Sequence, residues 1–386
     1  MHALGEIPSA NTAVGAAAEI VEGTWENDDG DRRWIAPTPG ELRQEIDRFH
    51  LPPDSVANRG TWAEWHYFNV LSRGGKRWAF ISFIVGGDVT GNDWGGNLGI
   101  TLRDEGGMTR RFATTIDRSR VRFSTADADL VFGDSRVTVL PNGDYEVVAA
   151  AREERAEGAG SGRGRIDISL TITPAPHAYF PGVSMGSGDF VSGYTVPALR
   201  AAASGRLCVD GVCETLAQAQ AYHDHNWGVW KGVTWEWGAS RAGQYTFLYG
   251  RVHSPDSTAS VPPVLVYLID SLGFRAVFRP KVISYEDGRI ARAGERRIAV
   301  PSRAVLFDER DGDTLHIELT IEDAIATDTR SQRREILGAG ADARDTSTNE
   351  TKHPYFIQMK GTARISGRLD GVRVEGLGTG FFETFR

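Results

Sequence analysis

The residues from Tyr222 to Gly228 carry the densest chemistry in the sequence. They read Tyr-His-Asp-His-Asn-Trp-Gly, so a phenol, two imidazoles, a carboxylate, an amide and an indole lie within one short run. Alternation along a β-strand would send the two histidines and the tryptophan to one face and the other three side chains to the opposite face. Each buried polar group would need a hydrogen-bond partner. The run therefore does not suit a strand of an ordinary apolar core, and it is the first candidate for a functional site.

His223 and His225 could act in two ways that the sequence leaves open. They could supply two ligands to a metal ion, but zinc needs a third ligand and the other histidines form no second pair of this spacing. They could instead serve a Ser-His-Asp hydrolase, whose activated serine usually lies in Gly-x-Ser-x-Gly. Residues 182–186 match those letters, but no helix pattern follows them. We favour a site without metal or cofactor and keep both alternatives open.

A second aromatic cluster lies at 62–69 and reads Trp-Ala-Glu-Trp-His-Tyr-Phe-Asn. Alternation would place Trp65, Tyr67 and Asn69 on one face, with Glu64 and its alternate neighbours on the other. The cluster fits a half-buried strand whose aromatic side chains fill a core. It fits the wall of an apolar ligand pocket equally well, so both interpretations stay open.

The composition limits the class of protein. The chain has 386 residues, enough for two domains, and its net charge of −8 argues against nucleic acid or an anionic membrane surface as the main partner. No apolar run approaches the roughly 20 residues that span a bilayer. The N-terminus lacks a basic region before its Ala-rich stretch, so we expect no secretory signal and a cytoplasmic protein. Peripheral membrane contact and the oligomeric state stay open.

Short strand-like runs dominate the chain after residue 60. Turn clusters of Gly, Asp and Asn separate the runs at 62–71, 77–85, 98–102, 120–124, 145–150 and 165–172. This spacing predicts an all-β antiparallel sandwich or barrel. One short helix is expected at 39–49, because a capping threonine and a proline precede apolar residues at helical spacing.

Two hairpin sequences resemble each other across the chain. Residues 204–212 contain Ser-Gly-Arg-Leu and then Asp-Gly-Val, and the same letters return at 366–372. The offset of 160 at the Asp-Gly turns, carried forward, sets Tyr222 against Phe382 and His223 against Glu383. The repeat indicates two related β-domains in tandem. We expect an N-terminal extension with the helix at 1–55, a first barrel at 56–230 and a second barrel at 231–386.

The first of these hairpins contains both cysteines. An Asp-Gly pair between apolar runs predicts a two-residue turn, which brings Cys208 directly opposite Cys213. A disulfide could form there in an oxidising compartment. Because no export signal is evident, we expect free thiols that act as small apolar side chains.

Three segments of the sequence resemble one family. They are Tyr222–Gly228, Gly-Tyr-Thr-Val-Pro-Ala-Leu at 193–199 and Glu-Trp-His-Tyr-Phe-Asn at 64–69. They resemble the carotenoid 1,2-hydratase (hydroxyneurosporene synthase) family, which includes lipocalin-like pericyclases such as the decalin-forming Diels–Alderases. The resemblance covers about residue 55 to the C-terminus, with Asp-His-Asn-Trp-Gly as its most specific motif. It implies two lipocalin-like β-barrels in tandem and catalytic roles for His225 and Trp227.

The sequence departs from that family at two places. The hydratases carry a downstream Tyr-x-Asp as the proposed proton donor, but Tyr249-Gly250-Arg251 has Arg where the acid should be. Their usual Glu-Trp-Trp-Tyr reads Glu-Trp-His-Tyr at 64–67. We therefore favour cyclisation or isomerisation over hydration.

These observations favour a cofactor-independent enzyme that acts on a hydrophobic, unsaturated substrate, such as a terpenoid, polyene or polyketide-like molecule. A positioned acid or hydrogen-bond donor would activate the substrate, and an aromatic pocket would hold it in a reactive conformation. A lipocalin-like protein that binds an apolar ligand without catalysis is the alternative. The catalytic candidates are His225, Trp227, Asp224 and Tyr67. The candidates for substrate binding are Glu64, Trp65, Trp94, Tyr194, Tyr222, Trp237 and Tyr249.

Overall fold

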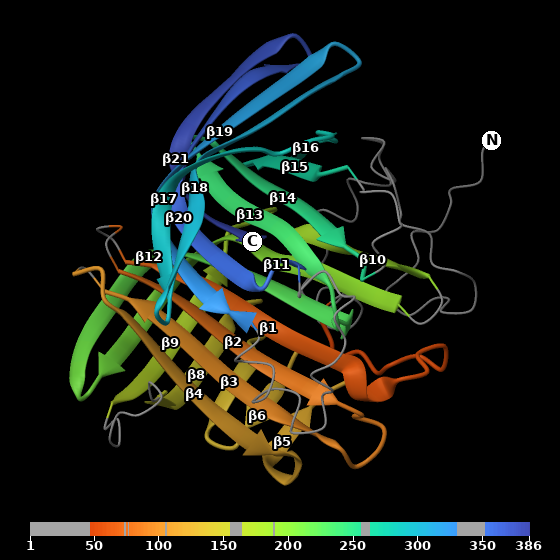
Figure 1. The fold of residues 1–386 in the computed structure, drawn as a ribbon, viewed down its shortest axis with the longest axis vertical. Coiled ribbons are helices and arrows are strands. Elements are labelled where there is room, and N and C mark those ends of the chain that lie inside the picture. The colour runs from red at the N-terminus through yellow and green to blue at the C-terminus, as the bar shows by residue number, and fades with distance from the viewer. Residues whose placement is uncertain are drawn as a thin grey trace. The chain divides into compact units, whose positions relative to one another are not determined.

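The computed structural model describes residues 47–72, 75, 77–104, 106–154, 164–187, 190–255, 263–329 and 352–386, with the backbone alone at 183–187. Most of these residues lie in antiparallel strands, which confirms the prediction of an all-β protein (Figure 1). The chain divides into two compact units, Met1–Trp230 and Lys231–Arg386. The helix expected at 39–49 lies outside the described residues except for its last three positions, which are not helical.

The first unit forms one antiparallel sheet that closes into a barrel. Its ring runs β1-β2-β3-β4-β8-β9-β11-β12, and β12 pairs with β1 to complete it. Strands β5 to β7 extend from β8, and β10 extends from β11. The elements are η2 (Arg59–Thr61), β1 (Trp62–Leu71), β2 (Trp78–Gly87), β3 (Trp94–Arg103), β4 (Thr109–Asp117), η3 (Arg118–Arg120), β5 (Val121–Phe123), β6 (Leu130–Phe132), β7 (Ser135–Val139), β8 (Tyr145–Glu153), β9 (Arg165–Pro174), β10 (Phe180–Ser187), β11 (Phe190–Val209) and β12 (Val212–Val229).

Alternating side chains fill this barrel with a packed core. In β9, Ile166, Ile168, Leu170 and Ile172 are buried, while the residues between them are more exposed. The facing strands contribute further apolar side chains to the same core. A small barrel of this kind encloses side chains rather than water. Any polar group inside therefore needs a hydrogen-bond partner within the barrel.

A β-bulge in β12 decides which residues of the run 222–228 point inward. Ala217 and Gln218 together lie opposite Ser204 alone. Gln218 has a positive φ of 57°, and its backbone N–H donates to Ser204 Oγ at 3.2 Å. The extra residue shifts the alternation by one position. As a result, the two histidines and the tryptophan of the run join the inward face.

The second unit has no such shift in its closing hairpin, which corrects the register that the repeat suggested. The turns do correspond, because Asp210 and Asp370 both have a left-handed φ, 52° and 48°. Beyond the turn, Phe382 is fully buried in the second core, whereas its expected counterpart Tyr222 is not part of the first core. The offset of 160 is therefore wrong at the closing strand, and Glu383 is not the counterpart of His223.

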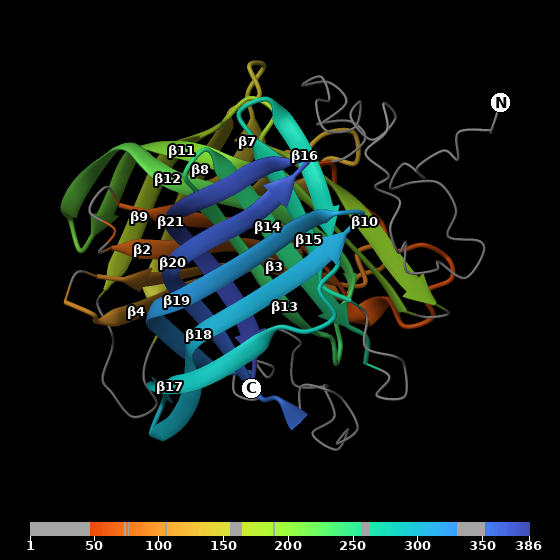
Figure 2. The same cartoon turned by 90° about the horizontal axis from the view of Figure 1, so that it is seen from above.

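The second unit also forms one antiparallel sheet, in the order β16-β15-β14-β13-β21-β20-β19-β18-β17. Figure 2 shows β17 to β21 side by side. The backbone N–H of Arg279, just after β16, donates to Asp308 Oδ2 of β18 at 2.6 Å, so the sheet curls back toward itself. Its strands are β13 (Thr234–Ala242), β14 (Tyr245–His253), β15 (Leu265–Asp270), β16 (Gly273–Phe278), β17 (Ser284–Ala293), β18 (Arg296–Arg310), β19 (Asp313–Asp328), β20 (Tyr355–Leu369) and β21 (Val372–Phe385).

The hairpin between β11 and β12 contains a disulfide. Cys208 and Cys213 lie opposite each other, as the Asp-Gly turn predicts, and their sulfur atoms are bonded. The expectation of free thiols is therefore wrong. The Asp-Gly turn therefore predicted the positions of the two side chains but not the bond between them.

Gly193 in β11 provides a test of the packing around Trp227. A Cβ atom at Gly193 would lie 2.4 Å from the indole of Trp227, its cross-strand neighbour. We expect Gly193→Ala to lower the free energy of unfolding by about 1–3 kcal/mol, because the buried indole must move. Urea unfolding followed by tryptophan fluorescence measures this change.

Gly86→Ala is the matched control for that substitution. Its Cβ would meet only a backbone oxygen at 3.9 Å, so we expect a change below about 0.5 kcal/mol. Equal effects of the two substitutions would contradict the close approach of Gly193 to the indole.

Candidate active site

Six ionisable side chains gather inside the first barrel, and each is at most 4% exposed. Two come from the segment before β1, two from β1 and two from β12. We call them the buried cluster: Asp47, His50, Glu64, His66, His223 and His225.

The pairing of β1 with β12 brings the inward residues of these strands together. His66 lies opposite His225, and Glu64 lies opposite Trp227. The segment before β1 is fixed beside them, because the backbone N–H of Phe49 donates to Ser124 O at 3.1 Å. The cluster is thus assembled by one strand register and one docked segment.

His225 lies between two buried carboxyl groups. Its Nδ1 is 2.7 Å from Asp47 Oδ1, and its Nε2 is 2.8 Å from Glu64 Oε1. An ionised carboxylate can only accept hydrogen bonds. Each of the two contacts therefore needs one proton between its atoms. Two protons shared by the three side chains supply both hydrogen bonds and leave one negative charge on the group. We call Asp47, His225 and Glu64 the proton chain.

Burial decides where the second proton of this chain lies. Desolvation raises the pKa of Glu64 well above its usual value and lowers the pKa of His225 to about 3. The neutral imidazole therefore donates from Nδ1 to Asp47 and accepts the proton of Glu64 at Nε2. Desolvation raises the pKa of Asp47 as well, but the Tyr145 hydroxyl donates to Asp47 Oδ2 at 2.5 Å and supports its anion. The raised pKa of Glu64 and its short contact with His225 Nε2 together assign the second proton of the chain to this buried acid.

His50 and Trp227 lie next to Glu64. The backbone N–H of His50 donates to both carboxyl oxygens of Glu64, at 2.9 and 2.8 Å, and His50 Nδ1 is 3.0 Å from Oε1. The His50 ring stacks on the indole of Trp227 with the ring centroids 3.7 Å apart. Within the described part of the chain, His50 Nε2 has no hydrogen-bond partner. Two stacked aromatic rings therefore adjoin the acid.

His66 and His223 lie beside Asp47. His66 Nδ1 is 3.9 Å from Asp47 Oδ1 and 3.5 Å from His223 Nε2. His223 Nδ1 donates to the carbonyl oxygen of Tyr67 at 3.0 Å. Burial lowers the pKa of His66 well below its usual value and that of His223 to about 4. Both rings are therefore neutral at physiological pH.

Two triads of the buried cluster have donor atoms close enough to meet a metal ion. They are Asp47, His66 and His225, and His50, Glu64 and His225, with all three atoms of each triad within 4.8 Å of one another. Zinc bonds of 2.0–2.1 Å place tetrahedral ligand atoms about 3.3 Å apart. The contacts of His225 at 2.7 and 2.8 Å are shorter and match direct hydrogen bonds. We interpret the cluster as a network of shared protons.

The structure separates the expected site residues onto two faces of β1, β11 and β12. Glu64, His225 and Trp227 share the inward face. On the opposite face, Asn226 Nδ2 donates to Asp224 Oδ1 at 2.6 Å, so Asp224 is not part of the proton chain. The expected residues on that face are Trp65, Tyr67, Tyr194, Tyr222 and Asp224.

The remaining expected residues lie apart from the proton chain. Trp94 packs against Phe123 at the first core, with ring centroids 5.8 Å apart. Trp237 and Tyr249 belong to the second unit, on opposite faces of its sheet, and Tyr249 is fully buried in the core there. Arg251 donates to Glu236, its cross-strand neighbour, at 2.5 Å. The arginine in Tyr-Gly-Arg therefore pairs with a carboxylate from the neighbouring strand β13.

Sequence reasoning did not find Asp47, His50, His66 or Tyr145 as site residues. His66 lay within a motif that was noted, but only the strand register shows that it faces His225. Asp47 is 178 residues from His225 and 98 from Tyr145, and no local pattern links such positions. The positions of the histidines along the sequence therefore did not indicate that four of them come together in the buried cluster.

No family model and no curated protein matches the sequence. Solved structures do match. A crystal structure of an AttH protein from Nitrosomonas europaea is 15% identical, with a TM-score of 0.54 over 87% of this chain and 96% of that chain. CghA, solved with Sch210972, is 14% identical, with a TM-score of 0.51 over 92% of this chain and 96% of that chain. The chain has the fold of these proteins. The lipocalin-like architecture implied by the resemblance is confirmed.

No helix among the described residues is long and apolar enough to cross a membrane.

The buried histidines of this fold make its stability depend on pH. An unfolded histidine has a pKa near 6.5, and burial lowers the pKa of all four histidines of the cluster. The unfolded chain therefore binds more protons below about pH 6.5, and the free energy of unfolding falls as the pH drops toward 4. Each histidine contributes up to about 1.4 kcal/mol per pH unit. The two carboxyl groups Glu64 and Asp47, whose pKa values are raised, oppose this slope. They are outnumbered by the four histidines, so the net slope keeps its sign.

Urea unfolding between about pH 4.5 and 7 measures this slope. We expect His223→Gln to make it shallower, because one group that is protonated only in the unfolded chain is gone. Identical slopes for the wild type and His223→Gln would contradict the assigned protonation.

Proposed function

We propose that this protein is an enzyme that transforms a hydrophobic, unsaturated small molecule by proton-assisted chemistry without a bound cofactor. The proton chain of Asp47, His225 and Glu64 carries the proposal. Burying ionisable groups costs stability, and apolar side chains of similar volume are often no worse for the fold. The presence of this proton chain inside an apolar barrel therefore favours a catalytic role. A protein that only binds an apolar ligand would not need buried ionisable groups.

Glu64 is the proposed acid. Its raised pKa keeps a proton available, and the backbone N–H of His50 would hold the carboxylate that remains after proton transfer. The same carboxylate can take a proton back from another carbon of the substrate. Because that cycle consumes no water and no cofactor, it suits isomerisation or cyclisation better than hydration.

Trp227 and His50 would shape the approach to this acid. Both lie next to Glu64 and stack on each other, so a substrate would replace part of that stack to reach the carboxyl group. An indole face can stabilise positive charge that develops on a protonated alkene. His225 would keep Glu64 oriented, because it accepts the Glu64 proton at Nε2 while Asp47 fixes its Nδ1.

The kind of partner is inferred from the fold. CghA, with which the chain shares a fold, was solved with the small molecule Sch210972. We infer a small apolar substrate, and we retain a terpenoid, polyene or polyketide-like molecule as the class to test. The cytoplasmic location also stays a prediction.

Glu64→Gln tests the proposed acid. The amide has the same shape but no acidic proton, so we expect kcat to fall by about 10²–10⁴-fold with little change in KM. Turnover of a panel of polyenes and polyketide-like substrates, followed by mass spectrometry with exchange in D2O, measures this loss. Wild-type kcat should fall as the pH rises through the raised pKa of Glu64, because the acid form disappears.

Glu146→Gln is the matched control, since Glu146 is a surface residue of β8 that pairs with Arg136 in the same barrel. It should keep full activity. Full turnover by a folded Glu64→Gln variant would remove Glu64 from the mechanism. Recovery of one unmodified ligand by native mass spectrometry, with no product after incubation, would favour the binding protein instead.

A further inference from the structure

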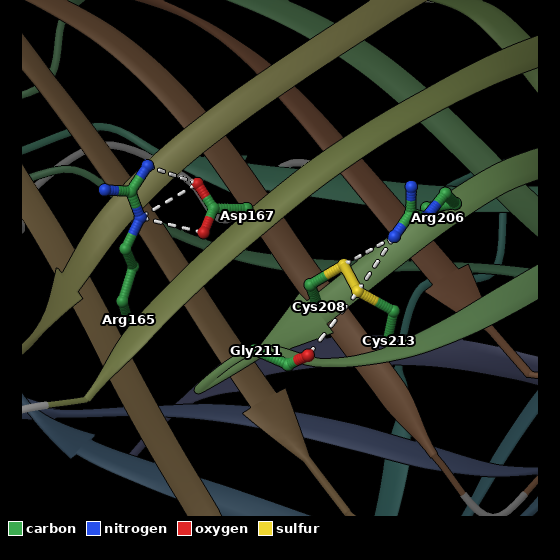
Figure 3. Close-up of a disulfide and its surroundings, with 6 residues drawn as sticks. All are labelled: Arg165, Asp167, Arg206, Cys208, Gly211 and Cys213. Carbon is green, nitrogen blue, oxygen red and sulfur yellow. Dashed lines mark hydrogen bonds and ion pairs between the residues drawn. A yellow bond between two sulfur atoms is a disulfide. The ribbon is translucent and has the colours of Figure 1, made fainter.

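The disulfide between Cys208 and Cys213 lies at the tip of the β11–β12 hairpin (Figure 3). Cys213 is exposed and Cys208 is half-buried. Only the turn and one further residue pair separate the two cysteines, so the bond closes a short loop. Such a bond constrains few residues of the unfolded chain.

The second unit shows that this kind of hairpin forms without a disulfide. Its turn at Asp370 and Gly371 has φ angles of 48° and 77°, close to the 52° and 83° of Asp210 and Gly211. At the position of the cysteine pair, the second hairpin has Arg368 opposite Arg373. Two like charges in a cross-strand pair do not stabilise a hairpin. The turn and its neighbours therefore suffice, and the disulfide is not needed to shape the first hairpin.

Arg206 places a positive charge beside one of the two sulfur atoms. Its Nη2 is 3.1 Å from Cys213 Sγ and 3.9 Å from Cys208 Sγ, as the dashed lines of Figure 3 show. A nearby guanidinium stabilises a cysteine thiolate. A stabilised thiolate is the better leaving group in thiol–disulfide exchange, and it favours the reduced form at equilibrium.

We propose that the Cys208–Cys213 disulfide is a thiol–disulfide exchange site for small monothiols of the glutathione type, with Arg206 as its positioning residue. A thiolate of the reductant attacks Cys208 Sγ, and the S–S bond breaks, which leaves a mixed disulfide on Cys208 and a thiolate on Cys213 beside Arg206. A second thiolate attacks the mixed disulfide and releases Cys208. Two reductant thiols become one disulfide, and the protein gains two thiols and two electrons.

The full-length protein equilibrated in glutathione buffers tests this proposal. Quenching with an alkylating reagent and mass spectrometry give the fraction of reduced protein at each ratio of reduced to oxidised glutathione. We expect half-reduction within the range that about 1–10 mM glutathione can set, because structural disulfides resist this pool and exchangeable ones do not. A protein that stays fully oxidised in about 10 mM reduced glutathione would overturn the proposal.

Two variants separate exchange from a structural role. Arg206→Gln should slow reduction about 3- to 10-fold and shift the equilibrium toward the disulfide, because the thiolate loses its cation. Arg165→Gln is the control, since Arg165 lies in the same view but bonds Asp167 rather than a sulfur atom. The double variant Cys208→Ser and Cys213→Ser should fold with an unchanged circular dichroism spectrum. Equal rates for Arg206→Gln and Arg165→Gln, or loss of the fold in the double variant, would overturn the proposal.

Discussion

The two hydrogen bonds of His225 are the interaction on which the candidate site depends. They join a carboxyl group from the segment before β1 to a carboxyl group of β1 itself, through an imidazole on β12. The three side chains are buried, and they satisfy one another within the barrel. The bonds therefore dock the segment around Asp47 and place the second proton of the chain on Glu64. The acid, its orientation and its covering residues all follow from this arrangement.

Much of the local structure could be predicted from the sequence. Alternation of side chains correctly separated His225 and Trp227 from Asp224, and the Asp-Gly pair correctly predicted the hairpin that opposes the two cysteines. The repeat correctly indicated a matching turn in the second unit. These features depend on residues close together in the chain, where strand period and turn chemistry act directly.

The composition of the site could not be predicted in the same way. Gln218 inserts one residue into β12, and nothing in its sequence neighbourhood distinguishes it from an ordinary strand residue. Asp47 and Tyr145 meet across the barrel because of tertiary closure, which no spacing in the sequence encodes. The second unit shares the Asp-Gly turn but carries Phe382 in its core, so the two closing strands place different side chains inside their units.

The protonation of His225 tests most directly whether Glu64 is the buried acid of the site. Nitrogen-15 NMR of the histidine side chains at pH 7 reports which ring nitrogens carry protons, and the His225→Gln variant assigns the signal. We expect a neutral ring with its proton on Nδ1, donated to Asp47, and an acceptor at Nε2 that faces protonated Glu64. A doubly protonated His225 between two ionised carboxylates would contradict the assignment of Glu64 as the buried acid.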